Sequence, residues 1–234
     1  MTTRQRREQA KRRRFVLGGI ALGLVLLAVP TDVVKKTMES VATFAGLDEE
    51  TTDVTLPRME VYALQLGVFD SGELAQSEQK KMLEKNIPCI IWQREKMRLI
   101  CAASTTEETL PMDAAGGRES CVIQETFPEV SIELSAGERD VQRAADFLRL
   151  PDDVFLKLTS GNDELEGIIE YVRHEASREK LLHPENELYV QLAQSLLNWC
   201  VLMEQMTVQP VDVRPYAAAT MCTLCRELRQ TLLH

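Results

Sequence analysis

An uncharged segment near the N-terminus limits the folds that this chain can adopt. Residues 15–30 hold no charged side chain, and they follow a tail, residues 1–14, with seven Lys or Arg residues and one Glu. A helix of ~15 residues rises only ~22 Å, less than the ~30 Å hydrocarbon core of a membrane. Continuing the helix to Val34 gives about twenty residues, enough to span that core. We therefore expect a transmembrane helix over residues 15–34.

Two other interpretations of this segment stay open. A cleaved signal peptide would have similar flanks, but no small-residue cleavage site is evident, and Pro30 fits poorly near one. A buried helix of a soluble domain would have to carry three glycines in its interior. We favour an uncleaved signal anchor, since cationic tails stay in the cytoplasm. Residues 1–14 would then be a cytoplasmic tail, residues 35–58 a stalk and linker, and the bulk of the chain would lie outside the cell membrane.

The charge of the chain is unevenly distributed. The formal net charge is -9, and the N-terminal tail contributes +6, so the remaining 220 residues carry -15. A nucleic-acid-binding surface needs cations to neutralise phosphates. The acidic body therefore argues against nucleic acid as a partner.

A run of nine residues, 61–69, predicts a β-strand with an unusual face. Alternation along a strand places Gln65, Gly67 and Phe69 opposite Tyr62 and Leu64. An amide, a bare backbone and an aromatic ring in a row suit a flat, uncharged, hydroxyl-rich ligand such as a sugar chain. For this strand taken alone, the simpler interpretation is a strand buried on both faces with one tolerated Gln.

The segment from residue 59 to residue 127 alternates strand and helix patterns. After the first strand, Asp70 and Glu73 form a capping-box pattern that predicts a helix to about residue 85. The next elements are two strands, a weaker helix and a final strand, at residues 89–93, 97–102, 104–118 and 120–124. This β-α-β-β-α-β order predicts a split-βαβ fold, with two helices on one face of a four-stranded sheet and the other face free for a ligand.

Five residues of this segment occur in the order of a known bacterial module: Tyr62, Gln65, Gly67, Phe69 and Ser71. They match an aromatic residue, a Gln-x-Gly-x-Phe-like strand and a Ser-rich helix start, and in this respect residues 59–127 resemble the SPOR (sporulation-related repeat) domain. Of the family's second half, Arg98 and the apolar alternation are kept. The resemblance implies a membrane-anchored scaffold of cell division or sporulation that binds peptidoglycan and has no catalytic activity. Its ligand would be glycan strands from which the stem peptides have been removed.

The resemblance also implies which residues would contact the glycan. Gln65 and Arg98 would hydrogen-bond sugar hydroxyl or acetamido groups on the open sheet face, beside the bare backbone at Gly67. Phe69 and Trp92 are the candidates for packing on sugar rings. Strand alternation allows Trp92 to be either a ligand contact or a core residue. The alternative function is a protein–protein adaptor of the cell envelope in which the SPOR-like domain is only structural.

Helical periodicity dominates residues 128–234. Apolar residues recur at helical spacing in four main segments. Pro151 is expected to end the first of them, with a short helix after it, and the other three lie at about residues 163–182, 185–206 and 215–233. We expect an all-α helical bundle here, and an α+β chain overall. Its simplest role is to dock an unknown envelope protein.

No residue pattern indicates catalysis, a metal site or a cofactor. Cys222 and Cys225 form a CxxC in the middle of a predicted helix, whereas a redox CxxC lies at a helix N-terminus and zinc needs further ligands. We therefore interpret these thiols as core residues. The six cysteines of an exported chain could form disulfides, and the sequence does not decide whether they do. We expect no enzymatic activity.

Overall fold

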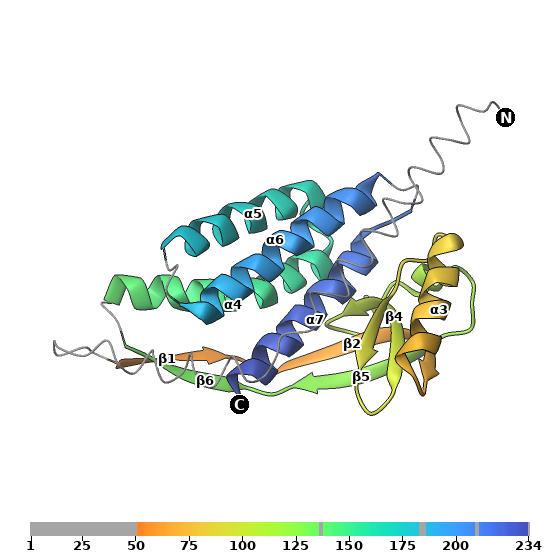
Figure 1. Ribbon diagram of the computed structural model, residues 1–234, viewed down its shortest axis with the longest axis horizontal. Coiled ribbons are helices and arrows are strands. Elements are labelled where there is room, and N and C mark those ends of the chain that lie inside the picture. The colour runs from red at the N-terminus through yellow and green to blue at the C-terminus, as the bar shows by residue number, and fades with distance from the viewer. Residues whose placement is uncertain (1–50, 136–137, 183–185, 209–210, 234) are drawn as a thin grey trace.

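The chain has an α+β fold in which an antiparallel sheet region is followed by four packed helices (Figure 1). The computed structural model describes residues 51–135, 138–182, 186–208 and 211–233. Four antiparallel strands form one sheet in the order β3-β4-β2-β5. Their bounds are β2 Met59–Phe69, β3 Ile90–Gln93, β4 Met97–Ser104 and β5 Cys121–Phe127. The sequence predicted these four strands in this chain order.

A second, two-stranded sheet joins β1, Thr51–Leu56, to β6, Val130–Ser135. Part of the expected linker over residues 35–58 is therefore a strand. The side chains of β1 alternate as in a strand with one buried face, because Val54 and Leu56 are buried, Asp53 is exposed and Thr55 is half-buried. The expected cytoplasmic tail and transmembrane helix lie outside the described residues. Within the described residues, no helix is long and apolar enough to cross a membrane.

The helix after β2 is α3, Gly72–Glu84, and its start differs by one residue from the prediction. Ser71 caps it by accepting a hydrogen bond from the backbone N–H of Leu74 at 3.3 Å, where the sequence pattern pointed to Asp70. The second expected helix, over residues 104–118, is reduced to a 3-10 turn, η1, Met112–Ala115. The split-βαβ strand order is thus present with one full helix.

An irregularity in β2 changes which side chains share a face. Leu64 pairs with Ala102, Gln65 with Ile100 and Gly67 with Leu99, so the register shifts on both sides of Gln65. As a result Phe69 packs in the core beside α3. The prediction that Gln65, Gly67 and Phe69 lie in one row was wrong, because strict alternation does not hold through a bulge.

The four C-terminal helices are α4 Glu138–Ser160, α5 Leu165–Leu182, α6 Glu187–Thr207 and α7 Arg214–Leu232. Pro151 lies inside α4 and does not end it, contrary to expectation. Leu148, Leu150, Val154 and Phe155, on either side of the proline, are all buried. Their packing outweighs the local cost of a proline within a helix.

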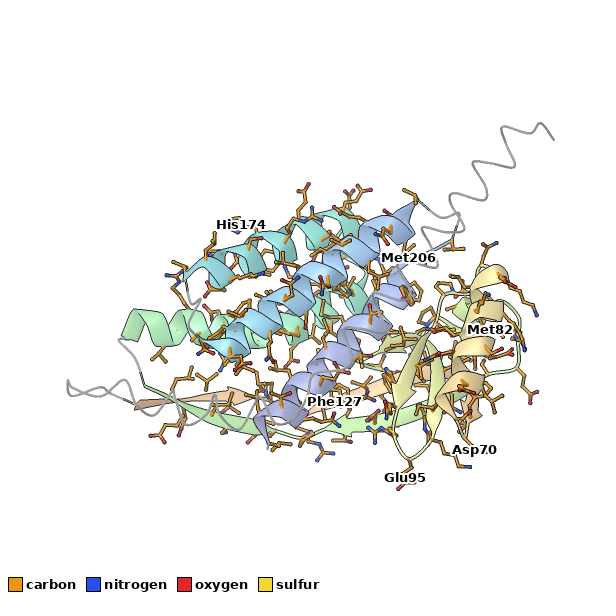
Figure 2. All side chains as sticks on the ribbon, viewed as in Figure 1. Asp70, Met82, Glu95, Phe127, His174 and Met206 are labelled. Atoms are coloured by element: carbon orange, nitrogen blue, oxygen red, sulfur yellow. The ribbon has the colours of Figure 1, made fainter. Side chains whose placement is uncertain are left out.

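Helix α7 covers the sheet face opposite α3 (Figure 1). One core joins the four C-terminal helices to Val61, Ala63, Ile90, Trp92 and Ile100 of the sheet, and a second lies under α3. Figure 2 places Phe127 of β5 beside the C-terminal half of α7, where the guanidinium of Arg229 lies 5.9 Å from its ring centre. The expectation of a free sheet face was therefore wrong over the area that α7 covers.

Candidate functional site

Gln65 and Arg98 meet on the sheet face that α7 covers. They lie on the neighbouring central strands β2 and β4, and Arg98 Nη1 donates to Gln65 Oε1 at 2.8 Å. The amide of Gln65 also donates to Cys121 Sγ at 3.1 Å. Gln65 is only 8% exposed, whereas Cys121 is exposed, so the pair lies just inside an accessible edge of the sheet.

Trp92 is a core residue. Its side chain is 0% exposed, and its indole Nε1 donates to Thr223 Oγ1 of α7 at 2.8 Å. The Thr223 hydroxyl in turn donates to the carbonyl of Ala219 at 3.0 Å, so the tryptophan is held to one turn of the helix. Of the two interpretations from sequence, the structure supports burial and leaves no surface of this ring for a sugar.

A cation from α7 lies over the same ring. The guanidinium of Arg226 is 5.1 Å from the ring centre of Trp92, within the range of a cation–π contact. Arg226 is only 6% exposed, and its Nε and Nη1 have no hydrogen-bond partner among the described residues. Burial lowers the pKa of Arg226, while the charge of Glu227 opposes that shift.

The turn between β3 and β4 adds a third arginine. Arg94 forms an ion pair with Glu125 of β5, whose side chain is 10% exposed. Burial, and then the positive charges of Arg226 and Arg98, lower the pKa of Arg94. The positive charges of the other two arginines therefore act on Arg94. We call the set Gln65, Trp92, Arg94, Arg98, Glu125 and Arg226 the arginine cluster.

Several polar atoms of the arginine cluster are buried without a hydrogen-bond partner among the described residues. Gln65 Oε1 already accepts from Arg98, and Glu125 pairs with Arg94. Besides the two free nitrogens of Arg226, Nε of Arg98 and Oε1 of Glu125 are buried without a hydrogen-bond partner among the described residues. Guanidinium groups present planar N–H pairs that match carboxylate or phosphate oxygens. The arginine cluster is therefore an incompletely hydrogen-bonded polar group at the contact between the sheet and α7.

The remaining residues predicted for glycan contact lie elsewhere. Gly67 and Phe69 are on the side of α3, and a Cβ added to Gly67 would lie 3.1 Å from the Phe69 ring. The structure thus brings together Gln65, Arg98 and Trp92 and separates the other two.

Sequence reasoning missed Arg94, Glu125 and Arg226. Arg226 had a detectable signal, because it lies four residues after Cys222 on a helix face otherwise predicted to be apolar. Arg94 and Glu125 resemble ordinary surface charges in the sequence. Only the folding of the β3–β4 turn toward β5 brings them to the cluster.

Most of the cysteines lie in the protein interior. All six thiols are free, and five are buried. Burial raises the pKa of Cys101 and Cys200 to about 12, and it also raises the pKa values of Cys222 and Cys225. No group of three His, Cys, Asp or Glu residues within the described part of the chain could hold a metal ion. The CxxC thiols therefore belong to the helical core, as the sequence suggested.

Comparison of the chain with protein-family models, with curated proteins and with solved structures finds no match. The function is therefore argued from the site itself.

Proposed function

We propose that the protein is a non-catalytic adaptor of the bacterial cell envelope, anchored in the membrane by residues 15–34. In this proposal the sheet region and the helices act as one body that binds a partner protein. The observation that supports it is the position of α7. This helix buries Trp92 and packs along β3 and β4, where a bound glycan strand would need open sheet.

A buried ion pair supports the view that α7 is a fixed part of this body. Arg229 of α7 is 1% exposed and pairs with Asp152 of α4 through two hydrogen bonds of 2.8 and 2.6 Å. The same guanidinium donates to the backbone carbonyls of Pro57 and Pro128, at 2.9 and 3.3 Å, beside the two sheets. Displacing α7 to admit a glycan strand would leave these groups unpaired, at a cost of several kcal/mol.

A crosslinking experiment tests the adaptor proposal. Cys121 is exposed and lies next to Gln65, so a benzophenone maleimide can be attached there in the full-length protein in native membranes. Illumination is expected to give a protease-sensitive adduct of one defined mass. The control is a protein with Cys121→Ser and a new exposed cysteine at Glu73, on α3. The same adduct from both positions, or none from Cys121, would count against a partner at this edge.

Glycan binding is the second candidate, and the hydrogen bond between Arg98 and Gln65 favours it. These two residues were the polar contacts implied by the SPOR resemblance, and Gln65 hydrogen-bonds the exposed Cys121 of the edge strand β5. A glycan end could reach them there without crossing the area under α7.

Co-sedimentation with purified peptidoglycan sacculi separates the two candidates. The assay would compare the full-length protein with Gln65→Ala and with Gln124→Ala, an exposed glutamine on β5 that is not in the arginine cluster. The adaptor proposal predicts no sedimentation above background for any of the three proteins. Sedimentation that Gln65→Ala abolishes and Gln124→Ala retains would instead establish glycan binding.

A further inference from the structure

A cavity lies where the start of α7 meets the loop that follows α3, at one end of the larger sheet (Figure 1). Its volume is about 230 Å³, whereas a cavity of ~150 Å³ can already hold a benzene ring. The residues that line it come from the loop after α3, from β4, from η1 and its end, and from residues 211–216. None of them belongs to the arginine cluster. The cavity is therefore a separate place in the fold, with room for a small molecule.

This cavity has a buried floor, apolar walls and a charged rim. On the floor, Cys101 and Tyr216 are 1% and 5% exposed, whereas Asn86, Asp113 and Asp212 are exposed at the rim. The walls are formed by apolar side chains, and these are Ile87, Pro88, Ala114, Val211 and Pro215. A ligand that matches this order of layers has a polar group at each end and an apolar stem between them.

The two rim carboxylates have no ion-pair partner within the described part of the chain. Asp212 Oδ1 accepts from the backbone N–H of Arg214 at 3.0 Å, while the guanidinium of Arg214 donates to a backbone carbonyl instead. On the side of Asp113, Arg118 pairs with a glutamate of α3, on which the charge of Lys85 also acts. The group that complements this rim is a cation.

An organic cation matches the rim better than a metal ion. No group of three His, Cys, Asp or Glu residues in the described ranges could hold a metal. An ammonium group needs only nearby acceptors, because it donates through three N–H bonds and does not require a closed set of ligands. The apolar walls suit the carbon stem that such a group carries.

The floor supplies one unpaired neutral group. The Tyr216 hydroxyl makes no hydrogen bond within the described residues, although buried tyrosine hydroxyls usually have a partner. The thiol of Cys101 differs, because it donates to the carbonyl of Leu64 at 3.6 Å. Unlike the unpaired atoms of the arginine cluster, the Tyr216 oxygen is not sealed from solvent, so it is reached through the cavity. Burial raises the pKa of Tyr216, so this hydroxyl stays protonated and can pair with a neutral hydroxyl.

Backbone contacts hold two walls in place before a ligand enters. Gly116, with φ +59°, closes η1 by donating to the carbonyl of Asp113 at 2.8 Å. The N–H of Ile87 donates to the carbonyl of Met82 at 2.9 Å, at the end of α3. The two turns are in close contact, because a Cβ added to Gly116 would lie 2.7 Å from the Ile87 side chain. Binding would therefore cost little ordering of these loops.

We propose that this cavity binds a small organic cation of the amino-alcohol class. Its ammonium group pairs with the rim carboxylates of Asp113 and Asp212, its short apolar stem lies along the walls, and its hydroxyl group hydrogen-bonds that of Tyr216. This inference goes beyond the adaptor function and does not depend on it.

Titration of the full-length protein in detergent, followed by saturation-transfer NMR, tests this proposal. The probe is 4-aminobutan-1-ol, which has six non-hydrogen atoms, like benzene. Butane-1,4-diol lacks its charge, n-butylamine lacks its hydroxyl, and protein-free micelles control for partition into detergent. We expect the amino alcohol to bind at least about fivefold more tightly than the diol, the effect of one opposite charge ~4 Å away in water. Equal binding of these two ligands, or no binding of the amino alcohol, would overturn the proposal.

Variants locate the two ends of the ligand. Asp212→Asn keeps the acceptor for the Arg214 N–H and removes the charge, so it should weaken amino-alcohol binding about fivefold, as should Asp113→Asn. Tyr216→Phe should weaken amino-alcohol binding by a similar factor and leave n-butylamine unchanged, because it removes only one hydrogen bond. Asp53→Asn, at an exposed position on β1, is the matched control and should bind like the wild type. Equal weakening by Asp53→Asn, no weakening by the two rim variants, or the same loss for both amines in Tyr216→Phe would overturn the assignment.

Discussion

Arg229 is the residue whose replacement tests most directly how α7 is fixed to the rest of the chain. Its guanidinium makes two hydrogen bonds to Asp152 and one each to the carbonyls of Pro57, Pro128 and Cys225. Burial favours loss of the charge, but the hydrogen bonds and charge of Asp152 outweigh it and raise the pKa of Arg229. Arg229→Met removes these donors and leaves the carboxylate of Asp152 buried without its cation.

The expected loss is large compared with the stability of a typical domain. Breaking a buried ion pair from one side costs ~3–5 kcal/mol, and domains are stable by only ~5–15 kcal/mol. We therefore expect Arg229→Met to lower the free energy of unfolding by ~3–5 kcal/mol. Urea denaturation of full-length protein in detergent, followed by tryptophan fluorescence, measures this loss at an unchanged m-value. Arg58→Met breaks the exposed pair with Glu60 and should cost less than ~1 kcal/mol.

The double variant Arg229→Met with Asp152→Leu separates the charge effect from lost packing. It removes both charges, so no uncompensated ion remains buried, and it should be more stable than Arg229→Met alone. If Arg229→Met costs less than ~1 kcal/mol, or if the two substitutions are simply additive, the argument that this pair holds α7 in place is refuted.

Two further predictions concern ionisable groups. Burial raises the pKa of Glu227 from 4.5 to about 7, so the folded protein holds this proton more tightly than the unfolded chain does. The free energy of unfolding therefore falls as the pH rises from ~4.5 to ~7, because the charged carboxylate is disfavoured only in the folded state. Glu227→Gln should therefore raise the free energy of unfolding by ~3 kcal/mol at pH 8 and leave it unchanged at pH 4. Glu84→Gln, at an exposed position, is the control. An equal gain at both pH values would contradict this reasoning. Thiol titration with a disulfide reagent should label one cysteine rapidly in the native protein and six after denaturation. Cys121→Ser should abolish the rapid reaction, and a second fast thiol in the wild type would disprove the burial of the other five.

Local sequence patterns determined most of the secondary structure. Apolar spacing located α5, α6 and α7 to within about two residues at most ends, because one helix face must be buried and its period is visible in the chain. The same logic identified the four strands of the larger sheet and their split-βαβ order. The predicted order also makes the strands of Gln65 and Arg98 neighbours, and in the structure these two side chains are hydrogen-bonded.

The tertiary structure decided the features that control the site. The bulge at Gln65 turned Phe69 toward α3, and packing carried α4 through Pro151. The placement of α7 against the sheet closed the face expected to be open, and it brought Arg226 to Trp92 across 134 positions of the chain. A periodic pattern shows that a face must be buried, but it does not show which other face will bury it. That choice depends on the fit of surfaces far apart in the sequence, and here it converted a predicted sugar-binding surface into a recessed cluster of arginines.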